Sequence, residues 1–291
     1  MEITSENLTN LIFEIINLLV SKIFNSIDQT IYSLLDKITF IDENMLDSPH
    51  FIKLFGSHSE PGIIMICNSL ALGVFIYYSF KLMLSYLVMS KIQSPIQFFF
   101  KSLIFIACMN ACLWICSEII SLISIVTKTL NILSEDLFGC DISFQTFLSS
   151  LNNLFYKNDS IYNLFSFDGI IKSFSSIGMI SLIFTYSLRY ILIQVFVLLS
   201  PIAFISLLLE NTEFFFKSWI RNFLSLLLIQ VFLSFILLLS NTFQYLSNPT
   251  IIKLLYIATI YAINRANLFM KELLGGLSYN ITSTLGSIKS R

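Results

Sequence analysis

The residues of this sequence that could do chemistry are a few charged or amide side chains inside long apolar runs. The ionisable ones are Glu118, Arg189 and Lys253, and the amide of Gln230 is a further candidate for a polar pathway. A charge at mid-membrane costs at least about 2.5–3.5 kcal/mol on insertion scales, so each should face protein or water. Glu118 and Arg189 lie in consecutive apolar runs and could pair. Two interpretations stay open: an ion pair or interfacial contact that sets helix register, or the lining of a hydrophilic path.

Signatures of catalysis and metal binding are missing from the sequence. It has no G-x-x-x-x-G-K-[ST] loop, no H-E-x-x-H and no G-x-S-x-G. Cys108, Cys112 and Cys116 share one face of an apolar helix, which is typical of a helix contact. His50 and His58 lie eight residues apart in a polar connector, where we expect them to be exposed. We therefore predict no enzyme, no catalytic residue, no cofactor and no metal ligand.

Composition predicts an all-α, polytopic helical membrane protein. Hydrophobic residues make up 56% of the chain and charged residues 12%, and the mean hydropathy is +0.80. Long apolar runs, rather than short alternating ones, favour helices over a barrel as the membrane-spanning structure. The net charge is −1 and no basic run occurs, so sequence-specific nucleic-acid binding has little support.

The apolar runs predict about five transmembrane helices, preceded by an amphipathic helix over Leu8–Leu35. The predicted regions follow the chain: an N-terminal amphipathic helix and connector (1–61), a hairpin of two spans with its connector at 81–101 (62–133), a loop region (134–173), a core of three spans (174–274) and a flexible tail (275–291). The last span, Thr250–Phe269, has a clean apolar core of only about thirteen residues, which alone could be interfacial.

Prolines divide the chain into these elements. Each one follows Ser, Glu or Asn and precedes a helical run, as expected of the first turn of a helix: Pro49, Pro61, Pro95, Pro201 and Pro249. This pattern matters most in the run Phe174–Leu209. Its 36 residues would extend roughly 54 Å as one helix, too long for a simple span. We therefore expect a span to end near Leu199 and a short helix to begin at Ser200-Pro201.

The segment that follows is predicted to be a cytoplasmic elbow, residues 200–221, before the span Asn222–Tyr245. Its candidate interface residues are polar or aromatic, with Trp219 as a membrane-interface anchor: Pro201, Thr212, Phe215, Trp219 and Arg221.

Charge asymmetry predicts the orientation. The connector 81–101 holds three lysines and no acid, so it should be cytoplasmic. Residues 1–61 and the loop between the second and third spans are acidic, which places both outside. Five spans then bring the basic C-terminus to the cytoplasm. We expect a multi-pass protein of the cytoplasmic (inner) membrane.

One segment resembles a known family. Arg189–Pro201 (RYILIQVFVLLSP), followed by Thr212, Phe215 and Trp219, is similar to the core of the TrbL-type polytopic inner-membrane subunits of type IV secretion and conjugation systems. The predicted topology resembles theirs over most of the chain. The connector Lys91–Lys101 looks like versions on mobile elements of low-GC Gram-positive bacteria. The short tail and the marginal fifth span depart from the family pattern.

The resemblance implies a homo-oligomeric channel or scaffold subunit that helps to move DNA, or relaxase-linked DNA, across the membrane. Its implied partners are the lipid bilayer and other type IV secretion subunits, including a secretion ATPase. Two alternatives remain from the residues themselves: a secondary transporter or permease for a small solute, and a pure membrane assembly scaffold.

Overall fold

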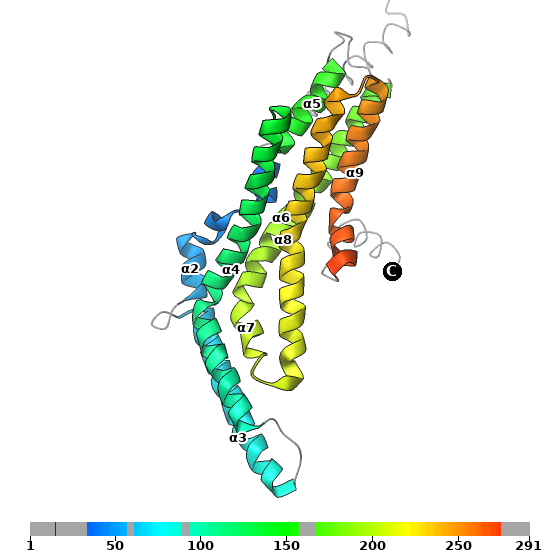
Figure 1. Cartoon of the computed structure of the whole chain (residues 1–291). Helices are drawn as coiled ribbons and strands as arrows, with labels where there is room; N and C mark the ends of the chain where they lie inside the picture. The colour runs from blue at the N-terminus through cyan, green and yellow to red at the C-terminus, as the bar shows by residue number, and fades with distance from the viewer. Residues whose placement is uncertain (1–14, 16–33, 57–60, 89–93, 157–166, 275–291) are drawn as a thin grey trace, which may run out of the picture.

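In the computed structural model, helices joined by short loops make up the residues that it describes, which are 15, 34–56, 61–88, 94–156 and 167–274 (Figure 1). No strand occurs among them. The all-helical class predicted from composition is therefore confirmed for this part of the chain. Of the predicted N-terminal amphipathic helix, Leu8–Leu35, only residues 15, 34 and 35 are among the described residues, and the predicted tail lies outside them.

Helix starts follow the prolines, as predicted. Pro49 opens α2 (Pro49–Phe55), Pro95 opens α4 (Pro95–Phe138), and Pro249 opens α9 (Pro249–Leu274). The hydroxyl of the serine before α2 accepts a hydrogen bond from Phe51 N at 3.1 Å, and the serine before α4 accepts one from Gln97 N at 3.3 Å. These bonds satisfy donors that have no partner inside the helix.

The long central run bends where its proline predicts. Helix α6 (Phe167–Leu198) ends just before α7 (Ser200–Ile205), and a 3-10 turn (Glu210–Thr212) leads into α8 (Glu213–Asn241). Helix α8 thus begins nine residues earlier than the predicted Asn222. The polar connector of the sequence is largely the first two turns of this helix.

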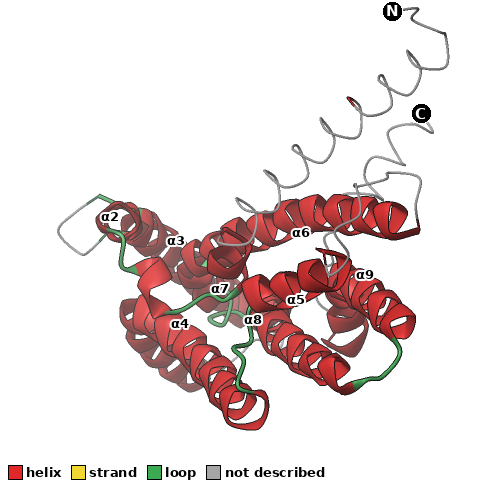
Figure 2. Ribbon diagram, turned by 90° about the horizontal axis from the view of Figure 1, so that it is seen from above, coloured by secondary structure: helices red, strands yellow, loops and turns green. Residues whose placement is uncertain are grey.

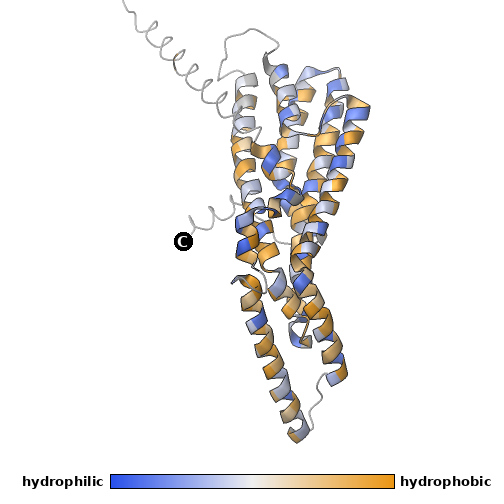
Figure 3. Ribbon diagram, turned by 90° about the vertical axis from the view of Figure 1, so that its left-hand side faces the viewer, coloured by the Kyte–Doolittle hydropathy of each residue, from blue (hydrophilic) through white to orange (hydrophobic). Residues whose placement is uncertain are grey.

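The helices are arranged at two levels along the molecule (Figure 1). Helix α3 (Ile63–Val88) forms a hairpin with the first half of α4, and this hairpin extends beyond the elbow. The upper level consists of the second half of α4, α5 (Phe144–Tyr156), α6, α8 and α9. Seen from above, α6, α8 and α9 lie side by side, and α5 packs against α8 and α9 (Figure 2). The upper helices carry more polar residues than the hairpin (Figure 3).

Four of the described helices are long and apolar enough to cross a membrane. These candidate spans are Ile63–Leu87, Pro95–Phe138, Gly169–Leu198 and Glu213–Tyr245. Helix α9, which contains the predicted fifth span, is not among them. A fifth crossing and the side on which each terminus lies stay predictions.

The predicted polar connector between the N-terminal helix and the first span is folded into the bundle. We name residues 36–47 the strap. It includes a 3-10 turn, Glu43–Leu46, and it leads into α2. The side chains of Thr39 and Ile41 are buried, although the sequence here reads as a surface loop.

Candidate functional site: a buried polar core and the cavity beside it

Arg189 lies in the interior of the upper level and is fully buried. Its Nε donates a hydrogen bond to the carbonyl oxygen of Leu226 on α8 at 2.8 Å, and its Nη1 donates one to the carbonyl oxygen of Thr39 at 2.9 Å. A guanidinium presents several donors in a rigid plane, so one side chain can hold two separate backbone segments. Arg189 thereby joins α6 to α8 and to the strap.

Gln230 holds the next part of the strap. It is 2% exposed, and its side-chain amide pairs with both backbone groups of Ile41. Ile41 N donates to Oε1 at 3.0 Å, and Nε2 donates to Ile41 O at 3.1 Å. Nε2 also lies 3.3 Å from the hydroxyl oxygen of Thr127 on α4. The side-chain amide of Gln230 therefore satisfies the backbone N–H and C=O groups of Ile41, as a neighbouring strand would in a sheet.

Asp36 fastens the start of the strap to α5. Its carboxylate oxygens accept hydrogen bonds from Phe144 N at 2.7 Å and Gln145 N at 3.3 Å. Burial raises the pKa of Asp36 above its ordinary value, and the two backbone donors lower it by a smaller amount. The strap is thus tied to α4, α5, α6 and α8.

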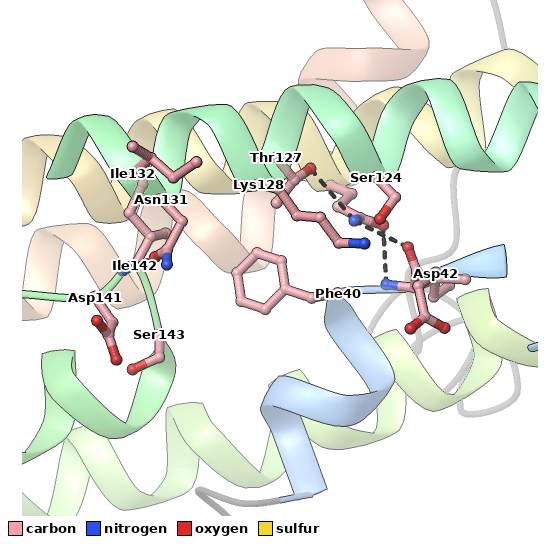
Figure 4. Close-up of a pocket in the computed structure, with 12 residues that line it drawn as sticks. Phe40, Asp42, Ser124, Thr127, Lys128, Asn131, Ile132, Asp141, Ile142 and Ser143 are labelled. Carbon is pink, nitrogen blue, oxygen red and sulfur yellow. Dashed lines mark hydrogen bonds between the residues drawn. The ribbon is translucent and has the colours of Figure 1, made fainter. Parts of the chain in front are cut away.

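A cavity of about 570 Å³ opens beside the strap (Figure 4). Lys128 from α4, Asp42 from the strap and Asp141 from the α4–α5 turn supply its charges. Its other lining residues are a mixture of polar and apolar side chains: Phe40, Ile41, Ser124, Thr127, Asn131, Ile132, Ile142, Ser143 and Gln230. Asn131 holds the turn in place, since its Oδ1 accepts from Ile142 N at 2.6 Å. One cation and two carboxylates in one cavity suit a small solute that carries both signs of charge.

The four predicted pathway residues have different environments. Arg189 and Gln230 contact neighbouring residues of the strap and form one buried polar core. Glu118 is exposed on α4, and among the described residues it makes no ion pair with the fully buried Arg189. Lys253 is half-buried near the start of α9.

The predicted elbow residues also differ in burial and in contacts. Trp219 is only 4% exposed, and its Nε1 donates to the carbonyl oxygen of Phe196 at 2.9 Å. Its ring packs against three phenylalanines, Phe204, Phe216 and Phe223. It is therefore an internal link of the elbow, unlike the interface anchor expected from the sequence. Pro201 is buried, the hydroxyl of Thr212 donates to Ser206 O at 2.7 Å, and Phe215 and Arg221 are exposed.

Metal-binding chemistry finds no support in the described part of the chain. No group of three or more His, Cys, Asp or Glu side chains there could hold an ion. His50 is exposed, and His58 lies outside the described residues. The thiols of Cys112 and Cys116 lie beside Ser200 of α7. These cysteines are part of a helix contact, as their spacing predicts.

Together, fold and site define an all-helical protein with four helices long and apolar enough to cross a membrane, whose deepest polar side chains bind its own backbone. Comparison with protein-family models, with curated proteins and with solved structures gives no match to this chain.

Proposed function

We propose that this chain is a membrane-embedded channel or scaffold subunit of a conjugative type IV secretion apparatus. The observation that carries the proposal is the use made of its buried polar residues. Arg189 and Gln230, the two candidates deepest in the bundle, hold the strap to the helices. A structural use of such residues favours an assembly component over a carrier that rebinds solute in each cycle.

The resemblance of Arg189–Pro201 to TrbL-type subunits supports the conjugative role. In this role the chain forms a homo-oligomer, contacts other secretion subunits including the ATPase, and lets DNA or relaxase-linked DNA pass. The strap lies outside and the connector 81–101 lies in the cytoplasm, as the positive-inside rule predicts. The near-neutral charge of the chain suits passage, because tight phosphate binding would retain the DNA.

Deletion of the gene in a donor strain tests this proposal. Plasmid or element transfer should fall to background while growth is unchanged, and the wild-type gene should restore transfer. The Arg189→Gln gene should restore transfer poorly, because the strap loses the hydrogen bond that the Arg189 guanidinium donates to it. Glu118→Gln is the matched control, since Glu118 is exposed and should restore transfer fully. Normal transfer by the deletion strain would refute the conjugative role.

A small-solute transporter is the second candidate, and the cavity beside the strap favours it. Lys128→Ala and Asp141→Asn remove charges from this cavity. A transporter would lose solute uptake in proteoliposomes with these changes, whereas a secretion subunit would keep normal DNA transfer. An assembly that purifies as a symmetric ring with a hydrated axis would favour a channel over a pure scaffold.

A further inference from the structure

Helix α4 is too long to lie wholly inside a bilayer. Its 44 residues extend about 66 Å at 1.5 Å per residue, whereas the hydrocarbon of a typical membrane is about 30 Å thick. At most about half of α4 can therefore contact acyl chains. The helices beside each half show which half this is.

Helix α3 accompanies the first half of α4. Tyr78 stacks on Phe98 with ring centroids 3.6 Å apart, and Cys67 near the start of α3 lies close to Cys112. The elbow reaches the same level, since Lys101 on α4 lies within electrostatic range of Glu213 at the start of α8.

Helix α9 is packed at the opposite level. Tyr256 of α9 contacts Phe147 of α5 and Phe243 in the 3-10 turn (Thr242–Tyr245) that follows α8. That end of α8 meets the second half of α4, where Asn241 Nδ2 donates to Ser134 Oγ at 2.9 Å. Figure 1 shows α3 and α9 at successive levels along the long axis. One bilayer about 30 Å thick cannot be crossed by both helices.

The distribution of charge selects the α3 level. On α4, Lys101 and Glu118 enclose 16 uncharged residues, and the 17 steps between them rise about 26 Å. The stretch 63–80 of α3 holds no charged residue either. On α9, by contrast, Lys253 and an exposed Arg265 are only twelve residues apart. Helix α9 also falls outside the set of candidate spans.

We propose that acyl chains surround a belt formed by 63–80 of α3, 102–117 of α4, 190–205 of α6 and α7, and 222–229 of α8. The exposed Lys217 and Arg221 in the first turns of α8 reach back to the elbow face with their long side chains. Helices α5 and α9 and the strap then lie together beyond one face of the bilayer. The chain then crosses four times, so its C-terminus lies on the same side as the strap. This proposal replaces the five spans and the cytoplasmic C-terminus that the sequence predicts. This inference rests on membrane embedding and is independent of the proposed secretion role.

The belt assigns two charged residues, Glu118 and Arg189, to positions relative to the membrane. Glu118 lies at the edge of the hydrocarbon, where an exposed carboxylate reaches water and needs no partner. Arg189 lies beyond the mid-plane, close to the face that carries the strap. The exposed apolar side chains of α9 then meet water or another protein instead of lipid, as illustrated by Ile251, Leu254 and Tyr261.

Paired spin labels in reconstituted nanodiscs test the belt. Ile76 on α3 and Leu254 on α9 are equally exposed in the fold, at 55% and 52%. A label at Ile76→Cys should be relaxed preferentially by oxygen, which concentrates in hydrocarbon. A label at Leu254→Cys should be relaxed preferentially by a water-soluble nickel chelate. Preferential relaxation of both by oxygen would overturn the proposal.

Side-specific labelling tests the four crossings independently of DNA transfer. Single cysteines at Ser48, Asn211 and Ser287 are placed in a Cys140→Ser background and treated with an impermeant maleimide. The position just after the strap and the tail position, Ser48→Cys and Ser287→Cys, should react from the same side of intact membranes. The elbow position, Asn211→Cys, should react only after permeabilisation. Reaction of the tail together with the elbow would show that α9 crosses and would overturn the topology.

Discussion

At the scale of residues, the buried polar core determines how the N-terminal part of the chain is held. Arg189 and Gln230 use charged and amide donors to satisfy strap carbonyls that would otherwise be buried without partners. Buried backbone groups are nearly always paired, so a strap at this depth requires side chains of this kind.

Replacing Arg189 should therefore loosen the strap. We expect Arg189→Gln to lower the free energy of unfolding by about 2–4 kcal/mol, since hydrogen bonds to charged groups contribute about 1.5–3 kcal/mol each. Thermal unfolding in detergent measures the change, and proteolysis near Asp47 should become faster. Arg221→Gln is the control, because this exposed arginine should change stability by no more than about 0.5 kcal/mol. Equal effects of the two substitutions would contradict the role of Arg189.

Asp36 gives the protein a pH-dependent contribution to stability. Its pKa is raised in the folded state above the ordinary value of 3.8, so the folded state binds the proton more tightly than the unfolded state does. The associated stability is fully present below the ordinary pKa and is lost as pH rises through the raised one. Asp36→Asn should remove this decline, which thermal unfolding between pH 3.5 and pH 7, roughly the range in which a perturbed carboxyl titrates, would detect. An identical pH profile for both proteins would contradict the assignment.

Part of the site could be predicted from the sequence. Arg189 and Gln230 stand out because they are polar residues within apolar runs. Their acceptors could not be predicted, because the carbonyl groups of Thr39 and Leu226 carry no signature of residue type. For the same reason the sequence allowed Arg189 to pair with Glu118, although backbone carbonyls serve Arg189.

At the scale of elements, helix starts were more predictable than packing. Serine caps and first-turn prolines act locally, so the starts of α2, α4 and α7 follow from a few adjacent residues. The strap was interpreted as an exposed connector because its composition is that of a loop. Its burial depends on side chains of α6 and α8, more than a hundred residues away, which a local pattern cannot reveal.

Gly178 sets the approach of α6 to α9. A Cβ at this position would lie 2.7 Å from Ile260 Cγ2, and the branched isoleucine side chain has little freedom to move away. Gly178→Ala should destabilise the protein by about 1–3 kcal/mol. Gly73→Ala is the matched control on α3, where a Cβ meets nothing within 4 Å. It should leave the thermal midpoint unchanged or raise it slightly through helix propensity. A lower midpoint for Gly73→Ala than for Gly178→Ala would contradict this packing.

At the scale of the whole molecule, the two levels of helices separate lipid contact from protein contact. The proposed belt is about 26 Å thick, from the rise of α4 between Lys101 and Glu118. Thermal stability in phosphatidylcholine bilayers of increasing chain length should therefore peak near this hydrocarbon thickness and fall in much thicker membranes, because mismatch destabilises the embedded state. A midpoint that rises steadily up to the thickest bilayers would contradict the belt.

The strap also imposes an order on biosynthesis. Ile41 leaves the ribosome 189 residues before the Gln230 that binds it, and Thr39 leaves 150 residues before Arg189. At roughly 5–20 residues per second, the strap waits about 10–40 s for its last partner. During that interval α3 and α4 have already been synthesised. The backbone groups of the strap must then form their hydrogen bonds with water or with an insertion factor. Native closure of the upper bundle is therefore a late event that requires translation to reach α8.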